Sequence, residues 1–310
     1  MALVAIVFVI TVFCFLLIHL LPGDPSQSLL GYSWTPAAGK AYDKSHGLTG
    51  PLAWQYWHWL NNALHGNLGY SNQHYPVTTL LGQGYRVDLE LVIYSQVLAF
   101  LMAIPLSVYS ARRPGGVTDT SSSAFTFGFY CLPAFVLVVW AVRVFCVGNH
   151  IFPGPGVSPY PSGVGFFDFI WTNLKVFFLP SLILALGTLA LYYRLLRGEM
   201  GMTLQEEFIT VARSKGLSTN RILWRHALRP SSITLLTSMG NTIALLITGL
   251  FIVELKFQLP GVGEELVGGI PNKDYWLVQG IALITAVTVV VVNFVIDIVT
   301  TFVDPRIARA

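Results

Sequence analysis

Residues 277–303, LVQGIALITAVTVVVVNFVIDIVTTFV, form a long apolar run that holds one charged side chain, Asp297. About 20 consecutive, mostly apolar residues are needed to cross the hydrocarbon core of a bilayer, roughly 30 Å thick, as an α-helix. This run is longer than that. It therefore predicts a membrane-spanning helix, and it decides the class of fold.

Five further runs of this kind occur in the chain. Of its 310 residues, 54% are hydrophobic and the mean hydropathy is +0.63, whereas a soluble domain has roughly 45–50% apolar residues. We predict an all-α, polytopic membrane protein with six transmembrane helices, the other five at residues 2–21, 89–111, 123–147, 176–196 and 233–254. Pro105 and Pro133 would kink two of these helices, but a helix bundle can satisfy the freed backbone groups, so we keep both spans.

The spans divide the chain into three parts: a first transmembrane helix (1–21), an extracytoplasmic segment (22–88) and a membrane core (89–310) that contains a cytoplasmic loop at 198–230. The first run lacks a basic start and a small-residue cleavage site, so we expect it to stay attached rather than be removed as a signal peptide. The three cysteines, Cys14, Cys131 and Cys146, fall within predicted spans, and we expect buried thiols that serve packing.

The positions of the basic residues predict the orientation. If both termini are cytoplasmic, eleven of the 18 Lys and Arg residues lie in inner segments and six lie outside. Lys and Arg are enriched in cytoplasmic loops. The distribution therefore favours cytoplasmic termini.

Two outer segments contain short helical patterns. PLAWQYWHWLNNALHG, residues 51–66, has apolar residues at helical spacing and ends at a glycine, which predicts a short interfacial helix. Its tryptophans, Trp54, Trp57 and Trp59, are typical of an aromatic anchor at headgroup level; a docking surface for an external partner is the alternative. GEELVGGI, residues 263–270, predicts a second short helix that begins with acidic residues.

Three polar side chains within or beside spans have structural explanations. Arg143 lies near the outer end of the third span, where we expect it to extend to the headgroups rather than line a pathway. Asp297 has no recognisable second acid or histidine as partner, so we favour a bond to a neighbouring helix over a proton relay. His19 is expected to be an interface histidine rather than a ligand.

The sequence contains no nucleotide-binding P-loop, no H-E-x-x-H zinc helix and no G-x-S-x-G nucleophile motif. We predict no catalytic residue, no metal site and no bound cofactor, and hence no enzyme. The basic loop EEFITVARSKGLSTNRILWRHALRP, residues 206–230, interleaves its charges with apolar residues at helical spacing. This pattern predicts folded helices with a protein partner, not a nucleic-acid site.

We expect two short helices in this loop, joined at Gly216. Phe208, Val211 and Ala212 have the spacing of one helix face, and Ser218 is a good N-cap for the second helix. A residue in left-handed conformation between them is easiest as glycine, because a Cβ there costs roughly 1–2 kcal/mol. The alternative is a basic loop that only fixes orientation.

The basic loop and several other segments of the chain resemble a known protein family. TVARSKGLSTNRILWRHALRP, residues 210–230, resembles the EAA coupling loop of ABC-importer permeases. HLLPGDP, GNLGYS, LPGVGEELVGGI, DYWLVQG and VDPRIA are similar to segments of the dipeptide, oligopeptide and nickel permease family, in the same order along nearly the whole chain. Thr210, Val211 and Ala212 stand where the general pattern has Glu-Ala-Ala, and threonine and arginine in this region are usual in the peptide branch of the family. The chain starts at MALVAIVF, whereas members of the family tend to begin with several basic residues before the first span.

The resemblance implies a type I importer with several subunits. A second homologous permease, two ATPase subunits or a fused pair, and an extracytoplasmic solute-binding protein would be the partners, besides the lipid bilayer. ATP and Mg would bind to the ATPases. The implied ATPase-coupling residues are Thr210, Ala212, Gly216, Leu217, Ile222, His226 and Leu228, and the implied external partner or gate residues are Trp57, Trp59, Pro260, Gly261 and Tyr275.

The function we expect is ATP-driven import of oligopeptides or dipeptides. Within the family, nickel or another metal chelate, or haem, would enter through a permease of the same kind. A proton-coupled secondary transporter is the alternative from another class. Against it stand the single Asp297 and the absence of an inverted repeat with broken helices in matching positions.

Overall fold

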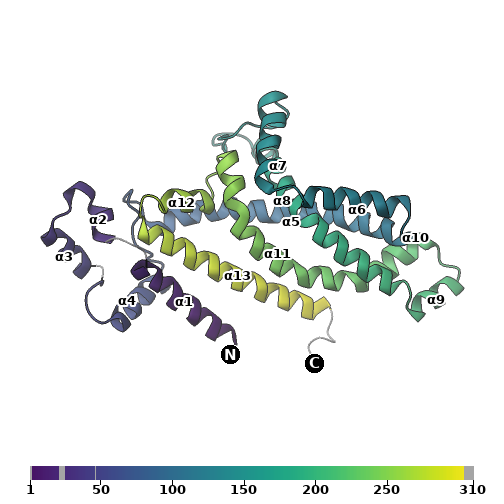
Figure 1. Ribbon diagram of the computed structural model, residues 1–310, viewed down its shortest axis with the longest axis horizontal. Coiled ribbons are helices and arrows are strands. Elements are labelled where there is room, and N and C mark those ends of the chain that lie inside the picture. The colour runs from purple at the N-terminus through teal and green to yellow at the C-terminus, as the bar shows by residue number, and fades with distance from the viewer. Residues whose placement is uncertain (1, 21–24, 46, 304–310) are drawn as a thin grey trace. The chain divides into compact units, whose positions relative to one another are not determined.

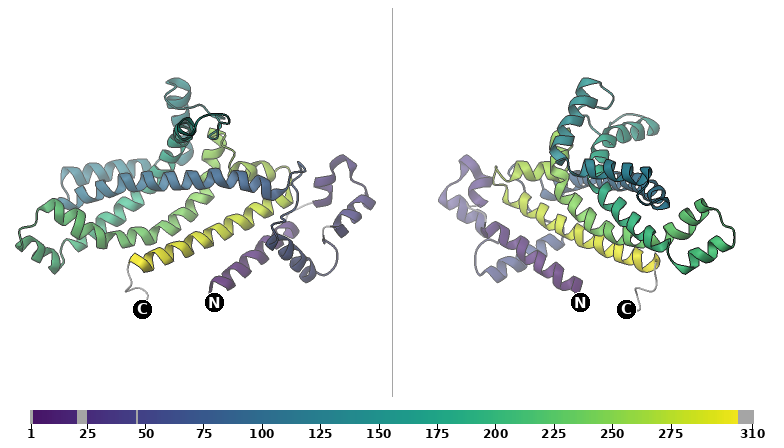
Figure 2. Two further views of the ribbon diagram at one scale, coloured as in Figure 1. Left: turned by 180° about the vertical axis from the view of Figure 1, so that it is seen from behind. Right: turned by 45° about the vertical axis from the view of Figure 1, so that its right-hand side comes forward.

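A computed structural model describes residues 2–20, 25–45 and 47–303 of the chain, and these residues contain no β-strand. The helices are labelled in Figure 1, and Figure 2 shows them from two further sides. In chain order they are α1 (Ala2–Leu20), α2 (Pro25–Leu30), η1 (Gly31–Ser33), α3 (Pro36–Ser45), α4 (Leu52–Leu64), α5 (Val77–Arg112), α6 (Val117–Tyr130), α7 (Ala134–Ala141), η2 (Val142–Gly148), α8 (Phe166–Thr203), α9 (Glu207–Ser214), α10 (Thr219–Arg221), η3 (Ile222–Ala227), α11 (Leu228–Phe257), α12 (Val262–Gly269) and α13 (Tyr275–Val303).

Four predicted spans fall on long apolar helices. The helices that contain them are α5, α8, the continuous helix that ends in α11, and α13, and each is long and apolar enough to cross a membrane. α5 and α8 extend well beyond their predicted spans. The first predicted span is helical too, as α1, and it contains the apolar stretch Ala5–Leu16.

The third predicted span is broken, which corrects the single helix expected at residues 123–147. α6 ends at Tyr130, α7 begins at Ala134, and the two directions differ by 91°. Pro133 has extended backbone (φ −57°, ψ 134°), and a proline also disfavours helical backbone in the residue before it. The break exposes Cys131, so the expectation that all three thiols are buried is wrong for this one, whereas Cys14 and Cys146 are buried.

The chain divides into two compact units. The first comprises Met1–Asp88 and Leu259–Val291, and the second comprises Leu89–Gln258 and Val292–Ala310. The parts predicted from the sequence follow one another along the chain. In the structure, α12 and the first part of α13 belong to the same unit as the N-terminal segment.

The first unit has an aromatic core between α1 and α4. The Phe15 ring lies 5.5 Å from Tyr56 and 5.9 Å from Trp59, centroid to centroid. The short helix predicted at residues 51–66 is confirmed as α4, and Gly66 beyond its end has the left-handed φ of +79°, while its place at the membrane interface stays a prediction. The predicted short helix with acidic first turn is confirmed as α12.

α12 packs directly on the start of α5. A Cβ on Gly84 would lie 2.9 Å from the backbone nitrogen of Val262, so only glycine permits this approach. One turn further along α5, the Asp88 carboxylate accepts a 3.1 Å hydrogen bond from the same Val262 N–H. This contact fixes the start of α12 and satisfies one of its N-terminal backbone donors.

The second unit is built around α8, which packs against α6, α7 and α11. Tyr192 and Tyr193 are fully buried on successive positions of α8. The Tyr192 hydroxyl donates a 2.6 Å hydrogen bond to Oε1 of Gln96 on α5, and the Ser107 hydroxyl donates to the Tyr193 carbonyl at 3.2 Å. These two hydroxyl groups are thus bonded between helices, as polar side chains in membrane bundles commonly are.

Candidate functional site

The basic loop after α8 folds into a helical elbow. α9 ends at Ser214, and Gly216 follows with φ +75°. The Gly216 N–H donates to the Arg213 carbonyl at 2.9 Å, and the Leu217 N–H donates to the Ala212 carbonyl at 3.3 Å. This pair of bonds is a Schellman motif, which needs left-handed backbone at the residue between helix and turn. The expected left-handed glycine is confirmed.

A small apolar cluster closes the inside of the elbow. Ile209, Ala212 and Ile222 are buried there, with Leu204 and Leu217 packed against them. The predicted helix with Phe208, Val211 and Ala212 is confirmed as α9, but the three side chains differ in burial, because Ala212 is buried whereas Phe208 is 47% and Val211 52% exposed. The buried positions of α9 are Ile209 and Ala212, three residues apart, so its other apolar side chains face outward.

The second half of the loop is not a separate short helix, which corrects that expectation. α10 begins after Ser218, whose backbone is extended as at an N-cap, although its side chain makes no capping hydrogen bond. The helix continues through the π-helical turn η3 into α11. Pro230 lacks an N–H and cannot bond the carbonyl four residues earlier, which accounts for the irregular turn just before it.

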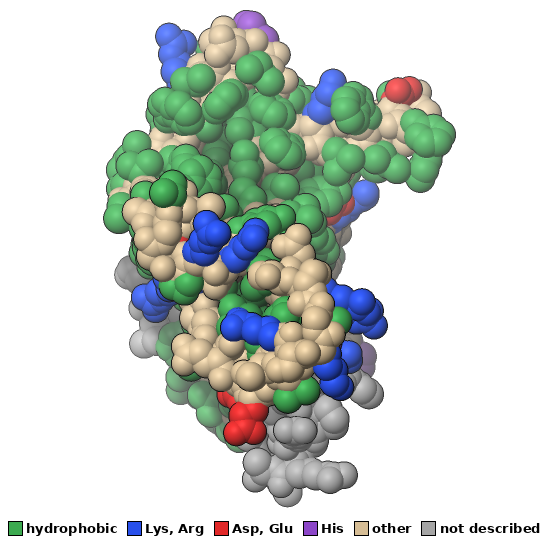
Figure 3. All heavy atoms as spheres, turned by 90° about the vertical axis from the view of Figure 1, so that its right-hand side faces the viewer, with side chains coloured by type: hydrophobic (Ala, Val, Ile, Leu, Met, Phe, Trp, Pro, Cys, Tyr) green, Lys and Arg blue, Asp and Glu red, His purple; other side chains and the backbone are tan. Residues whose placement is uncertain are grey.

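The predicted coupling residues lie partly on the exposed surface of the elbow and partly in its inner cluster. Thr210 and Gly216 are exposed, Leu217, His226 and Leu228 are half-buried, and Ala212 and Ile222 lie in the inner cluster. The exposed basic side chains around them are Arg213, Lys215, Arg221, Arg225 and Arg229. Figure 3 shows Lys and Arg side chains spread over the face that carries the elbow.

The elbow is fastened to the helices that precede and follow it. The hydroxyl groups of Thr203, at the end of α8, and Ser231, in α11, lie 3.0 Å apart. Met200, Leu223 and Ala227 belong to the buried core that α5 and α8 share. The elbow is therefore in contact with both of the long helices that flank it.

A partly buried ion pair near the end of α8 was missed by sequence reasoning. Nε and Nη2 of Arg197 in α8 lie 2.5 Å from the two carboxylate oxygens of Asp119 in α6. Oδ1 of Asp119 also lies 3.0 Å from the Tyr193 hydroxyl, and Oδ2 accepts a bond from the Gly115 N–H. The two partners are 78 positions apart, so the only local signal was an acid in the first turn of a helix.

A cavity of about 350 Å³ lies in the second unit among α6, α8 and α11. Its walls are mostly apolar, and Thr188, Arg194 and Thr242 supply polar groups. Ligand sites in helical bundles commonly lie between helices and combine an apolar wall with a few polar groups.

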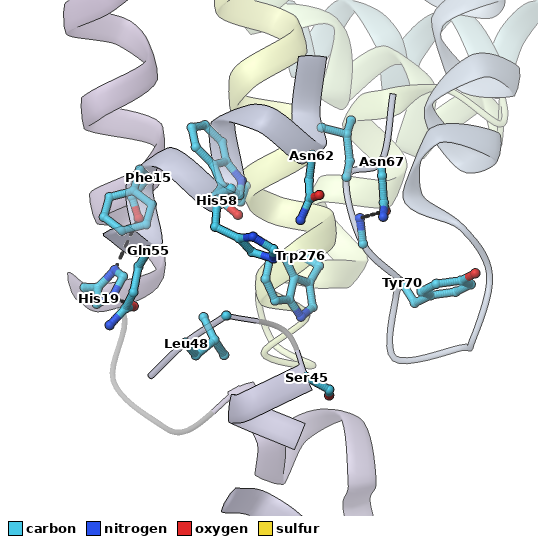
Figure 4. A pocket seen from close by; sticks show the side chains of 15 residues that line it. Phe15, His19, Ser45, Leu48, Gln55, His58, Asn62, Asn67, Tyr70 and Trp276 are labelled. Atoms are coloured by element: carbon cyan, nitrogen blue, oxygen red, sulfur yellow. Dashed lines mark hydrogen bonds between the residues drawn. The ribbon is translucent and has the colours of Figure 1, made fainter. Parts of the chain in front are cut away.

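The predicted external residues do not form one exposed surface. Trp57 is 67% exposed and Pro260 is exposed, whereas Trp59, Gly261 and Tyr275 are buried in the first unit. Trp59 and Trp276 instead line a cavity of about 180 Å³, together with polar side chains that include His58 and Asn62 (Figure 4). His19 lies at its edge, with Nε2 3.2 Å from Oε1 of Gln55.

An open acidic groove lies beside α12. Glu264, Glu265 and Asp274 line it with the amides of Asn72 and Asn272. Burial raises the pKa of Glu264. Burial also raises the pKa of Glu265, and the charges of Glu264 and Asp274 raise it further.

The side chains of Arg143, in η2, and Asp297, in α13, are both exposed. Their predicted roles stay predictions. Among the described residues, no group of three His, Cys, Asp or Glu side chains is placed to hold a metal ion.

Long apolar helices and a basic elbow between two of them define a polytopic, all-α integral membrane protein. The chain matches the family described as "Binding-protein-dependent transport system inner membrane component" over residues 103–309, and the N-terminal part of such components over residues 1–104. It belongs to this family and is a permease component of a binding-protein-dependent transport system. The alternative of a proton-coupled secondary transporter is thereby set aside.

Three relatives match over nearly the whole chain. The probable peptide ABC transporter permease protein y4tP of Sinorhizobium fredii is 30% identical over 98% of this chain and 96% of its own. The oligopeptide transport system permease protein AppB of Bacillus subtilis is 31% identical (96% and 94%), and a putative peptide transport system permease protein of Brucella abortus is 32% identical (98% and 95%).

A solved structure supports the fold. The chain is similar to a chain of the MetNI methionine ABC transporter in an inward-facing conformation, with a TM-score of 0.55 and 18% identity, over 73% of this chain and 96% of that one.

Proposed function

We propose that this permease is one membrane subunit of an ATP-driven importer for oligopeptides or dipeptides. It forms the translocation path with a second permease of the same family, receives solute from an external binding protein, and is driven by two ATPase subunits that bind ATP and Mg. The names of the relatives from Sinorhizobium, Bacillus and Brucella support the peptide solute.

The observation that carries the coupling role is the exposed face of the elbow. Phe208 and Val211 turn two large apolar side chains outward although the loop has its own closed interior. Exposed apolar residues surrounded by polar ones are typical of a protein contact. The surrounding basic residues would complement acidic side chains of an ATPase.

The orientation follows from the same residues. The elbow carries five exposed Lys and Arg side chains, which favours the cytoplasmic side, where ATP is hydrolysed. Both termini are then cytoplasmic, in a bacterial or archaeal cytoplasmic membrane. In the second unit, we assign the cavity with Thr188, Arg194 and Thr242 to this subunit's part of the solute path.

Reconstitution of the complete complex tests the proposal. Proteoliposomes with internal ATP and external binding protein should accumulate labelled di- and oligopeptides, and a complex with a hydrolysis-deficient ATPase should not. Accumulation of nickel or haem, with no peptide uptake, would replace the peptide assignment and leave the importer intact. Uptake that follows a proton gradient without ATP would overturn the importer itself.

A further inference from the structure

The second unit contains an apolar groove of about 460 Å³ near the end of α8 that lies far from the elbow. Its walls are formed by Val97 and Leu98 of α5, Phe152 of the loop after η2, and Trp171, Leu174 and Phe178 of α8. The Phe152 and Phe178 rings stack at 5.4 Å.

The lining determines what can fill the groove. Val97, Trp171, Leu174 and Phe178 are all at least 41% exposed although they are large and apolar. Such a surface binds water poorly, and α5 and α8 are membrane-spanning helices. The occupant must therefore be apolar over most of its length, as a hydrocarbon chain is.

One end of the groove carries a positive charge. The Lys175 ammonium lies 4.9 Å from the centroid of the Trp171 ring, and its side chain is exposed. A lysine in this position lays its stem on apolar surface and keeps its charge at headgroup level, where tryptophan is also enriched. The acidic side chain of Glu90 lies in the same region, and its carboxylate accepts a 2.8 Å hydrogen bond from the buried Asn173 amide.

We propose that this groove is a binding site for an anionic phospholipid, with one acyl chain along the apolar wall and the phosphate beside Lys175. Charge complementarity favours this occupant over an apolar helix of a second permease, which would leave the ammonium without an opposite charge. The site lies at the other end of α8 from the elbow and does not depend on which solute the protein carries.

Native mass spectrometry of the purified complex tests the site directly. The complex is released from nanodiscs that contain equal amounts of phosphatidylglycerol and phosphatidylcholine with the same acyl chains, and the retained lipids are counted. We expect the wild type to retain phosphatidylglycerol preferentially. Lys175→Gln should lower that retention about five-fold, the effect of one lysine near an anionic headgroup. Lys256→Gln, at another exposed lysine of the second unit, is the matched control and should retain the lipid.

A second variant separates the groove from the charge. Leu174→Trp fills the groove and keeps the charge of Lys175, so this variant should also lose the bound lipid. Lys175→Gln changes only an exposed side chain and is expected to fold. Equal retention of both lipids by the wild type, or full retention by Lys175→Gln, would overturn the proposal. So would a photo-crosslinker at position 174 that labels the second permease instead of lipid.

Discussion

Arg197 and Asp119 form a bidentate ion pair that joins α8 to α6 in the second unit, with both distances at 2.5 Å. The Asp119 side chain is 6% exposed and the Arg197 side chain 36%. Six residues further along α8 from Arg197 the helix ends and the elbow follows. The ion pair therefore joins the end of α8, where the proposed coupling elbow begins, to α6.

Removal of one partner should destabilise the protein. Asp119→Asn leaves the guanidinium without its carboxylate, and a fully buried pair broken in this way costs about 3–5 kcal/mol. Because Arg197 keeps partial contact with solvent, we expect a smaller loss, about 1–3 kcal/mol. Thermal unfolding of the purified complex measures it. Arg213→Gln, at an exposed arginine of the elbow, is the control, and an equal loss in both variants would contradict a special role of the pair.

The elbow should fail when Gly216 receives a branched side chain. Gly216→Val keeps every charge, and a Cβ would meet no atom within 4 Å, so the cost is conformational, roughly 1–2 kcal/mol. We expect reduced ATPase pull-down and reduced solute-stimulated ATP hydrolysis. Gly216→Asn should retain more activity, because asparagine tolerates left-handed backbone better.

Gly201→Ala is the matched control for that experiment. Gly201 is a helical glycine of α8 that likewise has open space around it, so alanine should be tolerated there. Normal coupling in a correctly inserted Gly216→Val protein would leave the basic loop with an orientation role alone.

The outward face of α9 should bind the ATPase. Phe208→Ala removes an exposed ring without opening the inner cluster, so pull-down should fall about ten-fold or more while the unfolding temperature stays unchanged, as for an interface hot spot. Phe167→Ala, at an 84% exposed phenylalanine near the start of α8, is the matched control. Equal pull-down by both variants and the wild type would refute the proposed contact.

Cysteine labelling should place the elbow inside the cell. In a background that carries Cys131→Ser, because Cys131 is exposed, a cysteine at Ser218 should resist an impermeant reagent in intact cells, and a cysteine at Gln73 should react. Labelling at position 218 from outside, with position 73 reacting normally, would invert the proposed orientation.

The acidic groove beside α12 should make stability depend on pH. The pKa of Glu265 is raised above its ordinary value of 4.5 by burial and by the neighbouring acidic charges, so the folded state favours the protonated carboxyl. This contribution is fully present below pH 4.5 and is lost as the pH rises through the raised folded-state pKa. Glu265→Gln should therefore be more stable than wild type at neutral pH and less pH-dependent. Unfolding temperatures of both proteins across pH 4–8 that run parallel would contradict this.

The sequence alone determined the features that depend on neighbours along the chain. Long apolar runs predicted helices that cross a membrane, because length and hydrophobicity suffice for that prediction. A glycine after an amphipathic stretch predicted the left-handed end of α9, and acidic residues after a Pro-Gly turn predicted α12.

Only the tertiary structure decided which side chains meet. It turned Ile209 inward and Phe208 outward, because burial depends on what packs against the helix and not on spacing within it. It buried Trp59 and exposed Cys131, and it broke the third span at Pro133, where a run of apolar residues cannot show whether the chain continues straight. It also brought Asp119 to Arg197, a contact between residues 78 positions apart that no local pattern specifies.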